Sequence, residues 1–566
     1  MAEGASQKGD SIVAQWPFPA RGVVRSLAEN ELSPDSLFVG DNLQLFHGEC
    51  RLRPRIRTPA AITANVNAAN ATLGLGTTVH RRTNGDVFTI VAEGISNGSV
   101  RRLENAGTWT DIGGGVVFAG SRDDSYRFTS LAFGTPLQNY TFLVRGNQAP
   151  YYWDPSLAGG NIVAVPGSPA NWKDATTVFD RIIGITDTEV SWGEILQVDN
   201  WPAVNVKSLM ETPDYCKAIR PFGNMNVIVF KERSIWKGLG NGEGTSAFSF
   251  RWQFAGYYEG PCGVNACDGT PLGYAYMTRN GRVGLYNGTK VDWIADQIWP
   301  LIRDDIDQTQ VCRVFVRYRE ANHQVVCLYP RTGDGGRVRG ILIIQLPQME
   351  SGVDKFAAFN GSFEADVALL ANAQVDIHCM GEFEKDAGAT VAVVAQLGMV
   401  GTRFSSGNGA TIYGQWEDLT NPVSSGGQHS SLDWNVQAYR VTARLQPGLL
   451  TSPKSDPHRI EAVEPFLRRG TDVATAGVGG GAVDTCDVFP VASDTLHTRG
   501  GVVGNTGTTI TDMDGTTPPV KETVGVSDTR VIGPHRGRFL GFRLDARSDN
   551  IALRYLGAII YARQVT

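Results

Sequence analysis

Short antiparallel strand units follow one another along much of this chain, and this repetition restricts the possible folds more than any other feature. Three clear units run from Val190 to Pro202, from Val227 to Gly242 and from Ala275 to Ile298. Each reads as strand, turn, strand, with aromatic residues on one side and Asn-Gly or Gly-x-Gly at the reversal, which is typical of antiparallel hairpins. Repetition of this unit over hundreds of residues predicts a closed ring of small sheets.

Candidate units recur between about residue 60 and residue 400, at intervals near the roughly 40 to 50 residues of a propeller blade. They predict an all-β protein with a β-propeller-like ring of six to eight blades. Stacked β-sandwiches also read as short strands with turns, so that architecture stays open. The units are Thr83 to Gly115, Arg127 to Pro155, Phe179 to Glu194, Met225 to Gly238, Leu272 to Gly288, Val314 to Leu346 and Phe356 to Glu384.

Changes in strand alternation and in Gly/Ser content along the sequence divide the chain into three expected parts. Residues 1–57 form an N-terminal arm and hairpin, in which Asn42 to Phe46 and Arg51 to Arg57 alternate on either side of a turn at His47 and Gly48. Residues 58–400 form the propeller-like domain, and residues 401–566 form a C-terminal β domain with long Gly/Ser-rich loops. That last part ends in alternating apolar strands between His535 and Val565.

Charge and composition limit the classes of partner. The chain of 566 residues has a formal net charge of -6, and its longest basic tract is the short run from Arg51 to Arg57. Tight DNA binding requires clustered Lys and Arg side chains that neutralise phosphates, so we expect no specific grip on DNA. A mildly acidic surface would let a polyanion pass without adhering. The simpler interpretation is an ordinary solvated surface, and the sequence alone favours it.

Targeting and redox signals are weak. The first residues lack the apolar stretch of a signal peptide, and no run of about 18 apolar residues predicts a membrane span. The 8 cysteines are scattered, which is typical of buried free thiols in a reducing cytoplasm. They are Cys50, Cys216, Cys262, Cys267, Cys312, Cys327, Cys379 and Cys486.

Three groups of polar residues suggest chemistry, but each has a simpler interpretation. Cys262 and Cys267 lack the second ligand pair that a structural zinc site needs. His378 and Cys379 are neighbours on a strand, where side chains point to opposite faces, so a buried Cys beside a surface His is expected. The acidic cluster Asp304, Asp305 and Asp307 has too few ligands for calcium and is expected at the solvated start of a short helix.

Other candidate motifs also favour structural roles. The glycine-rich runs Gly238 to Ser246 and Gly477 to Gly481 lack the Lys-Ser/Thr ending of a phosphate loop and are expected to be loops between strands. The fragment from Glu104 to Gly113 occurs once and does not match the repeated turns of a sialidase-type propeller. We therefore predict no catalytic, cofactor-binding or metal site, and no enzyme activity. Seven tryptophans at blade-like intervals predict core packing rather than a ligand platform: Trp153, Trp192, Trp201, Trp236, Trp252, Trp293 and Trp299.

The order of these phrases resembles one family, the β-propeller proteins that form the tail nozzle or head-to-tail connector and stabilise packaged DNA in short-tailed bacteriophages. The three units between Val190 and Ile298 carry the resemblance, together with two flanking phrases. An opening phrase of Asn, apolar strand, Gly and Arg-Pro is matched by Asn42, Gly48, Arg53 and Pro54. A closing phrase is matched by Gly537, Arg538, Asp549 and Asn550.

The resemblance implies a structural virion protein of the phage tail, made in the host cytoplasm. It implies a homo-oligomeric ring, a hexamer, that retains packaged DNA and conducts it during ejection. The implied partners are adaptor or portal ring proteins and tail fibre or spike proteins, with transient passage of double-stranded DNA, no specific DNA binding and no membrane insertion. The alternative is a receptor-binding or glycan-recognising tail propeller, which would gather exposed aromatic and carboxylate side chains in one pocket.

Overall fold

The structure is a computed structural model that describes the chain between residues 11 and 564 with gaps. Beyond residue 400 it describes the backbone of strands only. Shorter gaps of up to six residues interrupt the described ranges, and the longer gaps cover residues 58–65, 242–249, 348–355, 363–373, 384–395, 417–440, 470–484 and 494–521.

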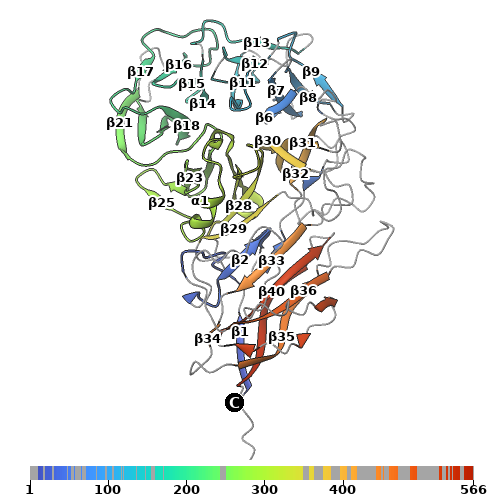
Figure 1. The fold of residues 1–566 in the computed structure, drawn as a ribbon. Coiled ribbons are helices and arrows are strands. Elements are labelled where there is room, and N and C mark those ends of the chain that lie inside the picture. Colours follow the sequence, from blue (N-terminus) through green and yellow to red (C-terminus); the bar gives the residue numbers. More distant parts are fainter. Residues whose placement is uncertain are drawn as a thin grey trace, which may run out of the picture.

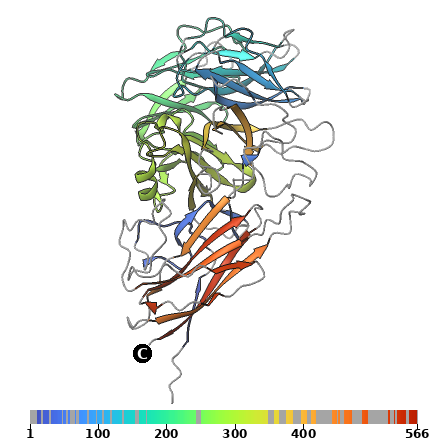
Figure 2. The ribbon, with the colours of Figure 1, turned by 45° about the vertical axis from the view of Figure 1, so that its right-hand side comes forward.

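Strands make up nearly all of the described secondary structure, which confirms the predicted all-β class. The described helical segments are α1 (Trp299–Asp305) and two 3-10 turns, η2 (Val311–Arg313) and η3 (Glu320–Asn322). The molecule is elongated, with a propeller at one end and a second β domain at the other (Figures 1 and 2).

Six separate four-stranded antiparallel sheets form blades of the propeller, as predicted. In five of them the four strands are consecutive in the chain. These are β6 to β9 (Thr72–Arg81, Val87–Ile95, Val100–Leu103, Trp109–Asp111), β10 to β13 (Arg127–Phe133, Gln138–Val144, Tyr151–Trp153, Ile162–Ala164), β14 to β17 (Asp174–Val178, Arg181–Ile185, Glu189–Trp192, Val206–Ser208), β18 to β21 (Cys216–Phe222, Asn226–Lys231, Ser234–Gly240, Phe250–Tyr257) and β22 to β25 (Cys267–Thr270, Gly273–Met277, Val283–Tyr286, Val291–Trp293).

The sixth separate sheet takes a strand from the other end of the chain. It contains β30 (Gln374–Phe383), β31 (Gln396–Phe404) and β32 (Ala410–Trp416). Its outer strand is β5 (Ile56–Arg57), which pairs with Gln415 and Trp416 of β32. Residues far apart in sequence therefore complete one blade and join the start of the propeller to its end.

Four further strands occupy a blade position and also belong to a larger sheet. They are β26 (Phe315–Arg319), β27 (Gln324–Pro330), β28 (Val338–Gln345) and β29 (Ala357–Ser362). The first of them, β26, contacts both β22 and β30. The same four strands continue through β2 (Leu37–Asp41) into a ten-stranded sheet with β33 (Val441–Pro447), β34 (Leu450–Thr451), β36 (Thr485–Ser493), β37 (Glu522–Gly525) and β40 (Phe539–Ser548).

A seven-stranded sheet completes the second domain. The predicted N-terminal hairpin is confirmed as β3 (Leu43–Phe46) and β4 (Glu49–Leu52). This hairpin is not a separate arm, because β4 and β1 (Ser11–Trp16) both pair with the last strand, β41 (Leu553–Gln564). The remaining strands of the sheet are β35 (His458–Arg469), β38 (Val531–Ile532) and β39 (Arg536–Gly537).

Sheet membership therefore departs from the expected division at residues 57 and 400. Strands from 1–57 lie in three different sheets, and β32 places residues 410–416 in a blade. The expected unit from Phe356 to Glu384 also spans two sheets, since β29 and β30 belong to different ones. Alternation in the sequence indicates a strand but does not indicate which sheet the strand joins.

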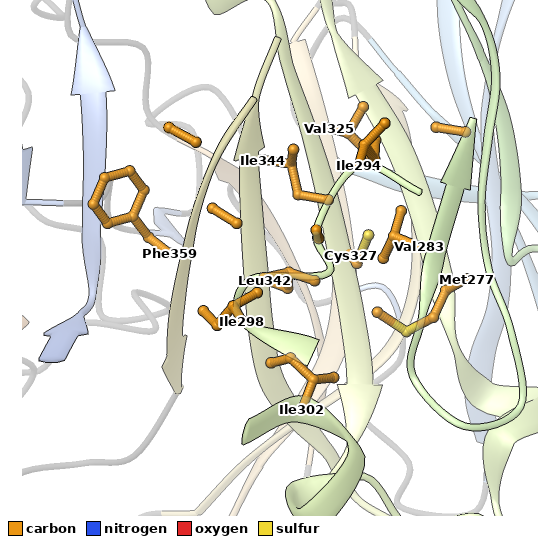
Figure 3. Close-up of a cluster of buried hydrophobic side chains, with 14 of the residues drawn as sticks. Met277, Val283, Ile294, Ile298, Ile302, Val325, Cys327, Leu342, Ile344 and Phe359 are labelled. Carbon is orange, nitrogen blue, oxygen red and sulfur yellow. The ribbon is translucent and has the colours of Figure 1, made fainter. Parts of the chain in front are cut away.

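One apolar core joins the propeller to the second domain. Buried side chains of β2 and β3, including Leu37 and Leu45, pack in the same cluster as Ile298 and Ile302 around α1 and Phe359 of β29. Figure 3 shows the part of this cluster that lies between α1 and the strands from Met277 to Phe359. Burying an aliphatic side chain of this size stabilises the fold by about 1.5 to 3 kcal/mol. The shared sheet and shared core predict that the two domains move as one body.

Candidate functional site

The first strand of each blade surrounds the axis of the ring. Neighbouring first strands contact each other, namely β6 with β10, β10 with β14, β14 with β18, β22 with β26, β26 with β30 and β30 with β6. Side chains that these strands direct toward one another decide whether the axis is open. We call one group of such residues the hub: Arg127, Asp174, Arg220, Asn265, Asp268 and Arg317.

Asp174 is the acceptor at the centre of the hub. Its side chain is fully buried and accepts hydrogen bonds from Arg127 Nε at 3.1 Å and from Arg220. The backbone N–H groups of Ala175 and Ile219 also donate to it, each at 3.0 Å. One carboxylate from β14 thus holds guanidinium groups from β10 and β18.

Arg127 also reaches across the ring. Its Nη1 donates to Asn265 Oδ1 at 3.0 Å, which links β10 to the residues just before β22, and these two strands do not belong to neighbouring blades. Asn265 Oδ1 also accepts from Arg317 Nη2 of β26 at 3.4 Å. Side chains in direct contact across the axis leave no room for a DNA duplex inside a single propeller.

The hub holds more positive than negative charge. It contains three guanidinium groups and two carboxylates, because Asp268 is the only acidic residue besides Asp174 in this set. Burial, followed by the nearby charge of Arg220, lowers the pKa of Arg127 to about 10, against the opposing effect of Asp174. The electrostatic cost of this arrangement falls on Arg127. The pKa of Arg220 is raised, because the effect of burial is outweighed by the charge and hydrogen bond of Asp174.

A second ion pair ties the last blade to the segment before β10. Arg122 donates to both carboxylate oxygens of Asp376 in β30, at 2.7 and 2.5 Å, and Asp376 also accepts from the N–H of Val338 at 3.1 Å. Arg313 of η2 donates to Asp123 at 2.6 Å. Both contacts join segments about two hundred residues or more apart in the chain.

Large apolar side chains are exposed near the outer strands of two adjacent blades. Tyr257 of β21 is 71% exposed, and its ring centroid lies 4.8 Å from that of Phe254, which is also exposed. Tyr215 lies next to the same edge, because its carbonyl accepts from Glu232 N, while Ser234 pairs with Tyr257. We call the following set the rim: Val204, Val206, Met210, Tyr215, Phe254 and Tyr257.

Among the described residues, Cys262 and Cys267 are not part of a metal-ligating group. The part of the chain that the structure describes has no group of three or more His, Cys, Asp or Glu side chains that could hold a metal ion. Burial raises the pKa of Cys267 to about 12, so its thiol stays protonated at neutral pH. Cysteines with described side chains are free thiols, and all are buried except Cys262 and Cys312, which are half-buried.

The expected surface position of His378 is wrong. Its side chain is buried, like that of Cys379, and its Nε2 lies 3.8 Å from Asp376. The register of β30 against β31 shifts between Ile377 and Cys379, and this irregularity breaks the alternation on which the prediction rested. Burial lowers the pKa of His378 to about 3.

The acidic cluster lies at the end of a helix rather than at its start. Helix α1 begins at Trp299 with Pro300 in its first turn, so Asp304 and Asp305 fall in its last turn. Asp305 accepts hydrogen bonds from Tyr329 at 3.0 Å and from Arg331 at 2.9 Å, while Asp307 accepts from Thr309 N at 3.0 Å. These carboxylates therefore anchor loops around α1.

The tryptophans have mainly packing roles, as predicted. Trp153, Trp192 and Trp236 are buried, and Trp201, Trp252, Trp293 and Trp299 are half-buried. The glycine-rich run from Gly238 leads out of β20, which pairs with β21, although residues 242–249 lie outside the described residues. The run from Gly477 to Gly481 lies outside them entirely.

Sequence reasoning missed the hub. Arg127, Asp174 and Arg220 each stand in or at the edge of short strands that are otherwise rich in apolar residues. A charged residue recurring in the first strand of successive units is the signal that would have identified it. The rim had no signal in the sequence, because an exposed apolar residue is of the same type as a buried one, and Val204, Met210 and Tyr215 lie outside the strands.

Comparison with known proteins adds no identification, since neither the scan against protein-family models nor the search of curated proteins found a match. Among the described residues, no helix combines the length and the apolar character that crossing a membrane requires.

Two buried histidines predict that acid destabilises the propeller. His80 donates to or accepts from Thr141 Oγ1 at 2.8 Å, and burial, followed by the charge of Arg82, lowers its pKa to about 4. Between pH 6.5 and 4 the unfolded chain binds a proton at this residue that the folded chain does not, so stability falls as pH decreases. The expected loss from His80 alone is roughly 3 kcal/mol at pH 4, by the 1.36 kcal/mol per pKa unit.

Chemical denaturation of the full chain at pH 7 and pH 4.5 measures this loss. His378 adds to it over the same range, because its pKa falls from 6.5 in the unfolded chain to about 3 in the folded chain. The variant His80→Gln cannot titrate and should lose less stability over this range than the natural protein. An equal loss in both proteins would show that His80 does not contribute.

Proposed function

We propose that the protein is a structural component of a bacteriophage tail, a nozzle or head-to-tail connector subunit. Several copies form a ring, a hexamer, that retains packaged DNA and conducts it during ejection. The order of the hairpin phrases supports this function. The arrangement of a propeller fixed to a second β domain by a shared sheet and a shared core is consistent with a rigid wall segment.

The observation that carries the most weight is the closed hub. Because Arg127 and Asn265 meet across the axis, a duplex has no passage through one propeller. A protein of this kind can conduct DNA only if several copies surround a larger channel between them. The proposal therefore requires lateral contacts between copies, and it requires no catalytic group.

The rim is where we place a lateral contact. It lies beside β21, which pairs with β20 on one side and with no other described strand, so its backbone edge and its exposed aromatic side chains are available to a neighbour. Exposed aromatic anchors of this kind dominate the energy of many protein interfaces. The implied neighbour is a second copy of the chain, seated on a portal or adaptor ring.

The double variant Val204→Asp/Tyr257→Asp tests this contact. Both side chains are mostly exposed, so the free energy of unfolding should change by no more than about 0.5 kcal/mol. Two buried charges at an interface should weaken ring assembly by at least about tenfold, or 1.4 kcal/mol. Light scattering and electron micrographs of the purified protein, with and without the portal and adaptor rings, measure assembly.

The control is Leu137→Asp, which adds a charge at an exposed apolar residue in the turn between β10 and β11. It should assemble like the natural protein. Equal assembly of the double variant would remove the rim from the interface. Failure of the natural protein to bind any head or tail ring would contradict the proposed function itself.

The exposed aromatic residues of the rim also suit the alternative, a tail propeller that recognises glycans, since sugar rings stack on such side chains. That function predicts binding of the isolated protein to a glycan array and a loss of binding in Tyr257→Ala. It predicts no dependence on a portal ring, so the two functions give opposite results in the same pair of experiments.

A further inference from the structure

The charges of the hub do not balance. Asp174 neutralises one of the two guanidinium groups that it contacts, Arg127 and Arg220. Asp268 accepts from Tyr318 N at 2.8 Å and is not in an ion pair with any described residue. The third guanidinium, Arg317, has no carboxylate partner among the residues that the structure describes.

Arg317 is the accessible member of this group. Its Nη1 donates to the carbonyl of Val316 at 2.9 Å and its Nη2 donates weakly to Asn265 at 3.4 Å. Its side chain is half-buried, and no described atom accepts from its Nε. A guanidinium with free donors, close to two further arginines in a partly dehydrated site, is a strong recognition element for oxyanions.

Arg220 supplies a second, independent observation. Its Nη groups donate to Asp174 and to the carbonyls of Ile219, Val264 and Cys267. Its Nε is buried and has no hydrogen-bond partner among the described atoms. A buried N–H without an acceptor costs about 1 to 3 kcal/mol, so a bound acceptor at this place would relieve a penalty as well as add an attraction.

We propose that the hub binds a small oxyanion on the axis of the propeller, held by Arg317 with Arg127 and Arg220. The ligand neutralises the surplus positive charge and ties together ring positions β10, β18 and β26. Its chemical class is a phosphate-type or carboxylate anion, small enough to lie among contacting side chains. This site is separate from the rim and does not depend on the proposed function.

Thermal unfolding of the full chain tests the site, with inorganic phosphate and acetate as probes at constant ionic strength in chloride. Only the folded state binds the anion, so the free energy of unfolding should rise with anion concentration. At an anion concentration about 100 times the dissociation constant, the stabilisation should be roughly 2.7 kcal/mol. The melting temperature should then rise by a few degrees. Stabilisation by phosphate alone identifies a tetrahedral anion, and stabilisation by acetate alone identifies a carboxylate.

The decisive variant is Arg317→Met, which keeps an apolar stem and removes the charge. Arg317→Met should weaken anion binding at least about tenfold. In chloride alone, the variant should be as stable as the natural protein or more stable, because one of three neighbouring positive charges is gone. The control Arg251→Met changes an exposed arginine of β21 and should retain the full effect. Equal stabilisation of Arg317→Met, or no stabilisation of the natural protein by either anion, would overturn the site.

Discussion

Asp174→Ala is expected to lower the free energy of unfolding by roughly 3 to 5 kcal/mol, the cost of removing one partner from a buried ion pair. The side chain of Asp174 has no exposed surface, and it accepts from two guanidinium groups and two backbone N–H groups. Without it, Arg127 and Arg220 keep their charges in a buried place with no carboxylate in contact. A loss of this size is a large part of the 5 to 15 kcal/mol that stabilises a typical domain.

Equilibrium denaturation by guanidinium, followed by tryptophan fluorescence, measures the effect. Asp187→Ala is the matched control on the same blade, because Asp187 pairs only with Lys173 through its side chain and is half-exposed there. A surface pair of this kind contributes about 0 to 1 kcal/mol. Similar losses in the two variants would show that the hub is not an organising element of the ring.

A second variant separates charge from shape. In Asp174→Ala/Arg220→Met one of the two stranded guanidinium groups is gone, so part of the lost stability should return. If the double variant is less stable than Asp174→Ala by the full cost of a buried truncation, Arg220 contributes packing rather than charge. The comparison is a double-mutant cycle, since the two residues are in direct contact.

Local pattern predicted the blades because every blade is made of hairpins. The turn between β23 and β24 is an example, since the Asn-Gly pair at Asn280 and Gly281 lies between strands that pair as expected, and Gly281 has a φ of 78°. A positive φ is the condition that places glycine in such turns. When a short turn joins two strands, the residues that pair are close in sequence, so a local pattern is enough to predict the pairing.

Pairing between distant segments could not be predicted in the same way. Strand β2 lies between β29 and β33, more than three hundred residues away from either. Alternation in Leu37 to Asp41 indicates a strand but does not indicate its partner. The error at His378 has a related cause, because one irregular residue in β30 reverses the face on which a side chain lies.

The contacts within the hub could not be predicted for a third reason. Its residues come from blades far apart in sequence, and the contact between Arg127 and Asn265 depends on ring closure. A lone arginine in a strand usually faces solvent, as the exposed Arg251 does. Only the geometry of the closed ring turns the same residue type into part of a buried network.

Removal of residues 1–57 is expected to prevent cooperative folding of the whole chain. The deletion takes β5 from the last blade, β2 from the centre of the ten-stranded sheet, and β1 and β4 from the edge of β41. It also takes five buried side chains from the core that joins the domains, Val23, Leu37, Leu43, Leu45 and Cys50. At about 1.5 to 3 kcal/mol for each large aliphatic side chain, this loss is comparable to the stability of an entire domain.

Size-exclusion chromatography and thermal unfolding followed by circular dichroism provide the measurement. The shortened chain should aggregate or unfold without a sharp transition. A three-part chain with a separable N-terminal arm predicts the opposite, a soluble and cooperative product from residues 58–566. The two outcomes distinguish an appended arm from a segment that completes both domains, because only the second makes the start of the chain a condition for closing the ring.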